Sequence, residues 1–307
     1  NWIKANPILE YDEDALENLV PVANTARDMG GEDLRDFLVK QLNMWMQWSN
    51  ALYIKDIKDW KRCAALRTLK DFRGSKCYVG VDLSSGGDLT SIAIVIPYMV
   101  DGVKKYFVHT HSFIPASRVD EHIKTDKVPY DVWISKGLVT VTETLGGIKT
   151  DYKYIIKYLE DLIKQNDLKP QLVCYDPHNA SAFLSDLEAL GFDSVAITQT
   201  AKELNDATVD FRLEIKAGNV VIEGTEVGKG KVVPFDELLT WSIANAKTIS
   251  NSYGEIKIDK ALDEDRIDPI DAIIDAWKEE YKPDTNEVVN EWLEMYEKYM
   301  GKGGEKE

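Results

Sequence analysis

Two short segments of the chain place an aspartate in or at the end of an apolar strand. Residues 80–84, Gly-Val-Asp-Leu-Ser, carry Asp82, and residues 173–177, Val-Cys-Tyr-Asp-Pro, carry Asp176. The apolar neighbours of Asp82 point to the opposite face of its strand. A buried carboxylate is costly unless it is paired or binds a metal ion. Asp176 lies at the carboxyl end of its strand, where open sheets build their sites.

A third acidic segment precedes a predicted helix. Residues 266–271, Arg-Ile-Asp-Pro-Ile-Asp, contain Asp268 and Asp271. Ligand sets made only of oxygen suit Mg²⁺ or Mn²⁺. Two such ions about 4 Å apart stabilise the attacking and leaving oxygens in phosphodiester hydrolysis. Taken together, the three segments are the inventory of a site for hard cations.

Each acid also has a purely structural interpretation, and the residues alone leave both interpretations open. Asp82 could accept hydrogen bonds from loop amides, and Tyr175-Asp176-Pro177 could form a turn at the exit of the strand. Asp268 has the properties of a helix N-cap followed by proline at the first helical position.

Other catalytic motifs do not occur in the sequence. Residues 228–231, Gly-Lys-Gly-Lys, lack the spacing of a P-loop, and there is no G-x-S-x-G or H-E-x-x-H segment. The three cysteines show no CxxC spacing, which argues against a disulfide framework and a structural zinc site. His109 and His111 share one strand face, which we expect to face solvent rather than to bind zinc.

The composition is that of a folded, acidic protein. The 307 residues are 44% hydrophobic and 29% charged, which argues against disorder of the whole chain. The formal net charge is −16, so charge alone argues against a free-standing DNA binder. The longest apolar run, residues 91–100, is too short to span a membrane. Since the chain has neither a signal peptide nor an initial Met, we expect a cytosolic piece of a longer protein.

The hydrophobic pattern changes near residue 76. Before it, apolar residues at helical spacing predict two helices, over residues 12–29 and 32–51. After it, strand-like segments at residues 77–83, 90–98 and 104–114, the first two joined by a hairpin turn at residues 84–88, predict a meander of three antiparallel strands. Helices and short buried strands then alternate, with predicted elements at residues 151–165, 171–175, 180–190, 195–198, 202–217, 220–223, 235–246, 249–258 and 268–281. This order predicts an α/β fold with a mixed sheet covered by helices on both faces.

Several short segments, in a fixed order, resemble a known family. They are Trp2-Ile3-Lys4-Ala5-Asn6-Pro7, the stretch from Phe37 to Trp45, Asp82-Leu83-Ser84 with Asp88-Leu89-Thr90, Tyr175-Asp176-Pro177 with Asn179-Ala180, and residues 241–245 and 257–260 with Ile267-Asp268-Pro269 and Ala272. Over nearly its whole length the chain resembles the nuclease domain of terminase large subunits, the DNA-packaging motors of tailed phages. The resemblance implies a ribonuclease H-like fold.

The resemblance also implies a metal site. Asp82, Asp176 and Asp268 are then the expected catalytic residues and metal ligands, and Asp82 is expected to bridge two Mg²⁺ or Mn²⁺ ions. Asp271 is an expected auxiliary ligand, with capping of the helix as its alternative role. In this mechanism the ions activate water and stabilise the departing oxygen, so no general-base side chain is required.

Three further residues are possible auxiliaries of this site. Asp88 lies in the predicted hairpin turn after the first strand and could contact the edge of the site. His178 could touch substrate, although packing is its favoured role. Lys260 could contact a DNA phosphate or remain solvated. The resemblance leaves the roles of all three residues open.

The resemblance implies a division of the chain into three parts and a set of partners. Residues 1–74 correspond to a helical linker after an ATPase domain that is missing here, residues 75–282 to the nuclease, and residues 283–307 to a C-terminal helix with a solvated tail. The implied partners are double-stranded DNA, the terminase ATPase domain, the small subunit and the portal protein, without a membrane. The C-terminal helix could dock on the portal or on its own domain, and the implied location is the host cell cytoplasm.

The expected function is a metal-dependent endonuclease that cuts concatemeric phage DNA when packaging starts and ends. We expect ATPase activity only in the full-length protein. The alternatives are another ribonuclease H-like nuclease, such as a resolvase or exonuclease, and an inactive module that binds DNA or portal. Residues 80–87 also resemble the first phosphate loop of actin-like and Hsp70-like ATPases, but a second glycine-rich loop is missing.

Overall fold

The computed structural model consists of two compact units, residues 1–52 and 53–307. The structure describes residues 2–29, 31–43, 51–84, 89–178, 180–260 and 265–280. Asp88 and the C-terminal helix expected after residue 283 lie outside the described residues. The domain boundaries expected from the sequence stay a prediction.

The first unit is helical, as its sequence predicts, but the second of its predicted helices ends at Leu42 and not at residue 51. Its helices are α1 (Trp2–Ala5), the 3-10 turn η1 (Pro7–Glu10), α2 (Glu13–Met29) and α3 (Gly31–Leu42). The ring of Trp2 packs edge-on against Phe37, with ring centroids 5.9 Å apart. Asn43 Nδ2 donates a hydrogen bond of 2.9 Å to the carbonyl oxygen of Ala5, so the two ends of this unit are tied together.

A mixed sheet is the centre of the second unit, in the order β1-β8-β4-β3-β2-β6-β7. Its strands are β1 (Ala64–Ala65), β2 (Lys76–Asp82), β3 (Thr90–Val100), β4 (Val103–Pro115), β5 (Val139–Thr142), β6 (Lys169–Tyr175), β7 (Ser194–Ala196), β8 (Val220–Val227) and β9 (Lys231–Pro234). The meander β2-β3-β4 is antiparallel, and β6 joins β2 in parallel. A separate antiparallel pair consists of β10 (Lys247–Ser250) and β11 (Ile256–Asp259).

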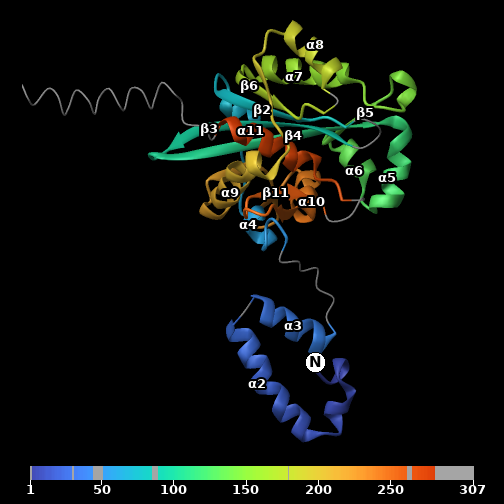
Figure 1. Cartoon of the computed structure of the whole chain (residues 1–307), viewed down its shortest axis with the longest axis vertical. Coiled ribbons are helices and arrows are strands. Elements are labelled where there is room, and N and C mark those ends of the chain that lie inside the picture. Colours follow the sequence, from blue (N-terminus) through green and yellow to red (C-terminus); the bar gives the residue numbers. More distant parts are fainter. Residues whose placement is uncertain are drawn as a thin grey trace, which may run out of the picture. The chain divides into compact units, whose positions relative to one another are not determined.

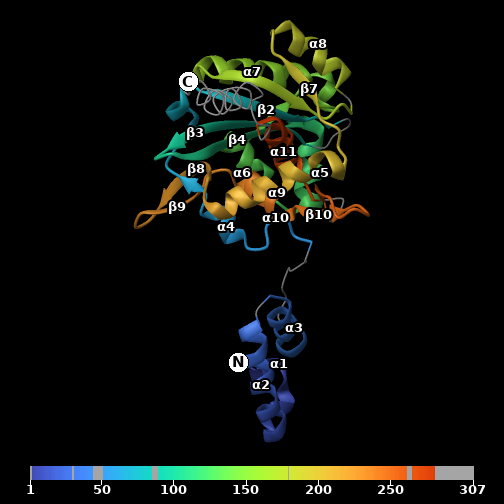
Figure 2. The ribbon, with the colours of Figure 1, turned by 60° about the vertical axis from the view of Figure 1, so that its left-hand side comes forward.

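Helices cover both faces of this sheet (Figures 1 and 2). One face packs on α7 (Tyr152–Asn166) and α8 (Ser181–Ala189). The other face packs on α4 (Ile57–Lys61), α9 (Ala201–Ala217), α10 (Glu237–Asn245) and α11 (Asp268–Glu280). This layering confirms the predicted α/β sandwich. None of the helices in the described ranges combines the length and apolarity needed to cross a bilayer.

Strand β2 presents its alternate residues to these two helical layers. Val79 and Val81 are fully buried against α7 and α8. Gly80 faces α11, where an added Cβ would lie 1.8 Å from the carbonyl oxygen of Ala272. The backbone of α11 therefore rests directly on β2. Asp82 shares the face of Gly80, since side chains two residues apart point the same way.

An inserted segment between β4 and α7 was not predicted from the sequence. It consists of the turn η3 (Ala116–Arg118), α5 (Val119–Asp126), α6 (Tyr130–Ser135), β5 and the turn η4 (Leu145–Gly147). Its apolar residues form a separate hydrophobic cluster with Ile114 of β4 and Leu238 of α10. Tyr130 and Trp133 of α6 are buried in this cluster. A further 3-10 turn, η2 (Leu69–Phe72), leads into β2.

The prediction that His109 and His111 face solvent is wrong. His111 is 6% exposed, and its ring stacks on Tyr158 of α7 with centroids 4.0 Å apart. Its Nε2 lies 2.8 Å from Thr140 Oγ1, and His109 Nε2 lies 3.3 Å from the Tyr158 hydroxyl. Burial lowers the pKa of His109 to about 4 and, together with His109, that of His111 to about 3. Both rings are therefore neutral packing groups beneath α7.

Asp236 ties helix α10 to the sheet. As N-cap it accepts a hydrogen bond of 2.7 Å from the Leu239 amide, and a second of 2.7 Å from the Thr110 hydroxyl of β4. Burial outweighs these bonds and raises the pKa of the Asp236 carboxyl to about 6. Since the folded pKa is raised, the ionised group lowers stability as pH rises from about 4 to 6.

Asp236→Asn is therefore expected to stabilise the unit by about 3 kcal/mol at pH 7, because one pKa unit corresponds to about 1.4 kcal/mol. Asparagine caps helices as well as aspartate does, so the helix start should persist. Urea unfolding at pH 4 and pH 7 measures the effect, which should vanish at pH 4. Asp56→Asn, at the exposed N-cap of α4, is the matched control. Equal gains from both variants at pH 7 would contradict the explanation.

Candidate active site

Strands β2 and β6 place two of the predicted acids side by side. The strands are parallel neighbours, with Val81 opposite Tyr175. Asp82 is the last residue of β2, and Asp176 directly follows β6. Parallel strands lie about 4.8 Å apart, so the two acids leave the same edge of the sheet together. Both residues are half-buried.

Helix α11 brings three more carboxylates to this edge. Asp268 is its first residue, and Asp271 and Asp275 follow at positions i+3 and i+7, on one face of the helix. The helix packs on β2, β3 and β6. The positive end of the helix dipole favours acids in the first turn. The local sequence thus explains why Asp268 and Asp271 are tolerated there.

The electrostatics of Asp82 indicate that these carboxylates converge. Burial raises the pKa of Asp82 well above its usual value. The negative charges of four other residues raise it further: in order of effect, Asp268, Asp271, Asp275 and Asp176. Repulsion of this kind acts over a few ångströms. The four predicted ligands therefore lie near enough to the end of β2 for their charges to act on one another.

Asp271 shares this environment. Burial raises its pKa well above the usual value, and the charges of Asp275 and Asp268 add to the effect. Lys257 on β11 acts in the opposite direction and lowers the pKa of Asp271. Lys257 Nζ also donates a hydrogen bond of 3.4 Å to the carbonyl oxygen of Gln199. The ammonium group of Lys257 thus lies close enough to stabilise the ionised cluster in part.

Asp275 is a functional candidate that the sequence analysis missed. It is 2% exposed, and Gln199 Nε2 donates a hydrogen bond of 2.8 Å to its Oδ1. Burial raises the pKa of Asp275 to about 8, although the Gln199 bond lowers it, and the charge of Asp176 contributes to the rise. The available signal was its spacing: an acid four residues after Asp271 in an otherwise apolar helix.

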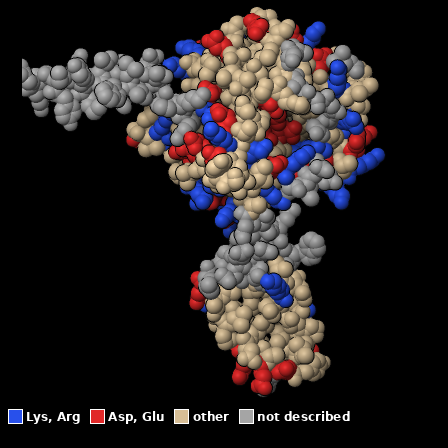
Figure 3. All heavy atoms as spheres, in the orientation of Figure 1, with Lys and Arg blue, Asp and Glu red and all other residues tan. Residues whose placement is uncertain are grey.

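The chemistry of this cluster fits hard divalent cations. In the part of the chain that the structure describes, no three acidic, histidine or cysteine side chains stand in a ready-made metal arrangement. The donors are nevertheless all carboxylate oxygens, which Mg²⁺ and Mn²⁺ prefer. A divalent charge would offset the repulsion that raises the pKa values of Asp82 and Asp271. Figure 3 shows acidic side chains gathered in a recess, over the region where Figure 1 draws α11.

The remaining predicted residues have simpler surroundings. His178 is exposed, and its backbone amide donates a hydrogen bond of 2.9 Å to Asp176 Oδ1. The turn expected at Tyr175-Asp176-Pro177 therefore exists, and Asp176 also belongs to the acid cluster. Lys260 is exposed, and its amide donates to Asp259 Oδ1 at 2.8 Å. Asp88 lies outside the described residues.

Comparison with known proteins identifies the family to which this chain belongs. Residues 1–282 match the family model described as terminase large subunit, endonuclease domain. The chain belongs to this family.

Individual relatives agree with this assignment. The terminase large subunit of Enterobacteria phage HK97 is 26% identical over 270 residues, which cover 87% of this chain and 48% of that protein. The terminase large subunit of Lactococcus phage p2 is 22% identical over 205 residues, covering 67% of this chain and 35% of that protein. The chain thus spans half or less of the length of these relatives.

The fold agrees as well. The crystal structure of the HK97 bacteriophage large terminase superposes with a TM-score of 0.62 and 25% identity, over 91% of this chain and 53% of that one. This confirms the predicted mixed α/β, ribonuclease H-like fold. The order of the strands, with an antiparallel meander followed by parallel additions, is the part of that fold that positions the acid cluster.

Proposed function

We propose that this chain is a metal-dependent endonuclease that cuts double-stranded DNA by two-metal phosphodiester hydrolysis. One observation carries the proposal: Asp82 and Asp176 end two parallel neighbouring strands, and helix α11, which starts at Asp268, packs on both strands, so that the acids repel one another there. Carboxylates that repel one another at the ends of two strands attract divalent cations, because the positive charge offsets the repulsion. Membership of the endonuclease family supports the same conclusion.

The residues divide the work as follows. Asp82, Asp176 and Asp268 would hold the ions, and Asp271 would be an auxiliary ligand. Bound Mg²⁺ or Mn²⁺ would supply an activated water and stabilise the charge on the scissile phosphate. Gln199 orients Asp275 through its hydrogen bond, and the positive charge of Lys257 on β11 favours the ionised form of Asp271. Lys260 and His178, both exposed, remain candidates for contact with DNA.

The biological setting is also a proposal. We infer that the nuclease cuts concatemeric DNA at the start and end of packaging, in the cytoplasm of the host cell. The proposed partners are the ATPase domain, the terminase small subunit and the portal protein. The acid cluster accounts for only part of the net charge of −16, so the chain alone should bind DNA weakly and in a salt-sensitive way. Its partners would hold the DNA at the site.

The test is cleavage of a supercoiled plasmid by the purified chain. We expect nicked and linear products with Mn²⁺ or Mg²⁺ and none with EDTA. Branched and single-stranded DNA in parallel reactions separate an endonuclease for duplex DNA from a resolvase or an exonuclease. Failure to cut any of these substrates at millimolar metal would overturn the proposal and favour a binding module.

A further inference from the structure

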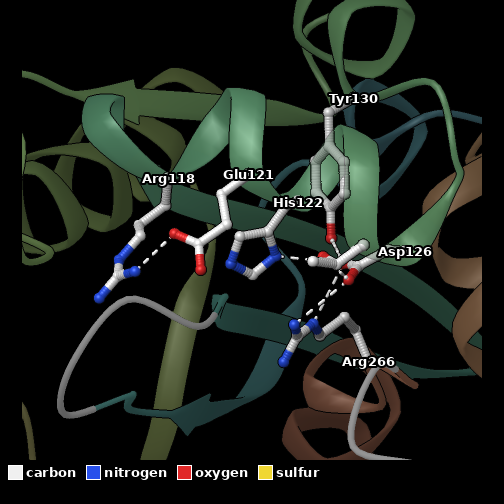
Figure 4. A network of polar contacts seen from close by, with 7 residues as sticks. Arg118, Glu121, His122, Asp126, Tyr130 and Arg266 are labelled. Carbon is white, nitrogen blue, oxygen red and sulfur yellow. Dashed lines mark hydrogen bonds and ion pairs between the residues drawn. The ribbon is translucent and has the colours of Figure 1, made fainter.

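A buried polar network connects helix α5 to the start of helix α11 (Figure 4). Asp126 is the last residue of α5, and its side chain is fully shielded from solvent. Arg266 Nε donates a hydrogen bond of 3.1 Å to Asp126 Oδ2, and Arg266 Nη2 donates one of 3.3 Å to Oδ1. The Tyr130 hydroxyl donates to Oδ2 at 2.9 Å, and His122 Nδ1 lies 3.1 Å from the same oxygen.

The network holds Asp126 as a carboxylate. Burial alone would raise its pKa, but hydrogen bonds from His122, Arg266, Thr125 and Tyr130 outweigh burial and hold the pKa below its usual range. The guanidinium of Arg266 is itself only 11% exposed. A pair that uses two donors of arginine and both oxygens of a carboxylate fixes direction as well as distance. The position of Arg266 is therefore determined by α5.

Arg266 lies next to the first turn of α11. The Ile267 carbonyl oxygen accepts hydrogen bonds from the amides of Ile270 at 3.0 Å and Asp271 at 2.9 Å, which starts the helix. Asp268 is two residues beyond Arg266. It also lies near the network, because its charge contributes to raising the pKa of Tyr130, behind burial and Asp126. The contact with α5 thus acts on the backbone that carries two proposed metal ligands.

We propose that the Asp126–Arg266 pair is a positioning device that fixes Asp268 and Asp271 for metal binding. Asp126 and Arg266 belong to segments 140 residues apart, so the pair joins the inserted segment after β4 to the acid cluster. Side chains that orient metal ligands from outside the ligand set typically contribute 10–100-fold to metal affinity. This inference rests on the proposed function, because it assigns a role toward the ions of that site.

The test measures Mn²⁺ affinity of the full chain by calorimetry, together with thermal melting in EDTA. Asp126→Asn keeps the shape of the side chain and removes its charge, whereas Arg266→Lys keeps the charge and removes the paired geometry. We expect both variants to bind Mn²⁺ about 10–100-fold more weakly. Plasmid cutting should then require correspondingly more Mn²⁺, while the KM for DNA stays unchanged. If Asp126→Asn does not fold, Arg266→Lys carries the test.

The matched control is Glu121→Gln. It breaks the ion pair between Arg118, which is half-buried before α5, and the exposed Glu121 of α5, and it should leave Mn²⁺ affinity unchanged. Wild-type affinity in folded Asp126→Asn and Arg266→Lys would overturn the inference and leave the proposed function intact. If the wild-type chain itself binds no Mn²⁺, the proposed function and this inference both fail.

Discussion

Replacing Asp82 with asparagine is expected to abolish metal-dependent DNA cleavage and, at the same time, to stabilise the metal-free chain. Metal ions supply several kcal/mol of transition-state stabilisation, and each 1.4 kcal/mol is tenfold in rate, so cutting should fall by about 10³-fold or more. The stability effect has the opposite sign. Burial and the charges of four neighbouring carboxylates raise the folded pKa of Asp82. The ionised group therefore destabilises the fold increasingly as pH rises above about 4, its unfolded value.

Two measurements check this result. Plasmid nicking with Mn²⁺ gives the loss of activity, and melting curves in EDTA at pH 5 and pH 8 give the change in stability. A gain of 1 kcal/mol should raise the melting temperature by about 2–4 °C, and the gain should be larger at pH 8. Asp101→Asn is the control, at an exposed turn with φ of 51°, where asparagine is tolerated equally well. Normal cutting by Asp82→Asn would refute the assignment of the site.

Replacing Gly80 with alanine is expected to displace helix α11 from strand β2 and to destabilise the fold. The added Cβ would lie 1.8 Å from the carbonyl oxygen of Ala272 and 2.9 Å from the amide nitrogen of Ala276. These are backbone atoms, so no side-chain rotation can relieve the clash, and the helix must move away from β2. Overpacking of a core typically costs about 1–3 kcal/mol, and a backbone clash belongs at or above the upper end. Asp268 would move with the helix, so cleavage should also be lost.

Denaturant unfolding and plasmid cutting test this expectation together. Gly102→Ala is the control, because its Cβ would meet no atom within 4 Å. Since Gly102 has φ of 78°, that variant should lose only about 1 kcal/mol to backbone strain, and it should keep its activity. A Gly80→Ala protein as stable and active as this control would show that α11 does not need its close contact with β2.

Much of the second unit could be predicted because its signals are local. Strands β2, β3 and β4 are short apolar segments joined by turn residues, and helix α11 carries its own start signals, Asp268 and Pro269. The strand acids of the site were found because each lies in or directly after an apolar strand. Asp82 and Asp176 stand out for this reason.

The features that escaped prediction depend on contacts between distant segments. Helix α5 has 8 residues and α6 has 6, and such short segments give only a weak periodic signal in the sequence. The local sequence around Asp126 does not indicate its pairing with Arg266, which is 140 residues away. Tyr158 of α7 contacts both His109 and His111, and the sequence of β4 alone does not predict this contact. Asp275 was hidden within an apolar helix.

Strands β2 and β6, which end at Asp82 and Asp176, are neighbours in the interior of the sheet. Backbone amides in such strands exchange with solvent only when a large part of the fold opens. Local fraying of an edge strand therefore cannot relieve the repulsion among the acids. The repulsion instead lowers the free energy of global unfolding. A cation that neutralises the cluster should slow hydrogen exchange across both strands and the surrounding core together, rather than near the acids alone.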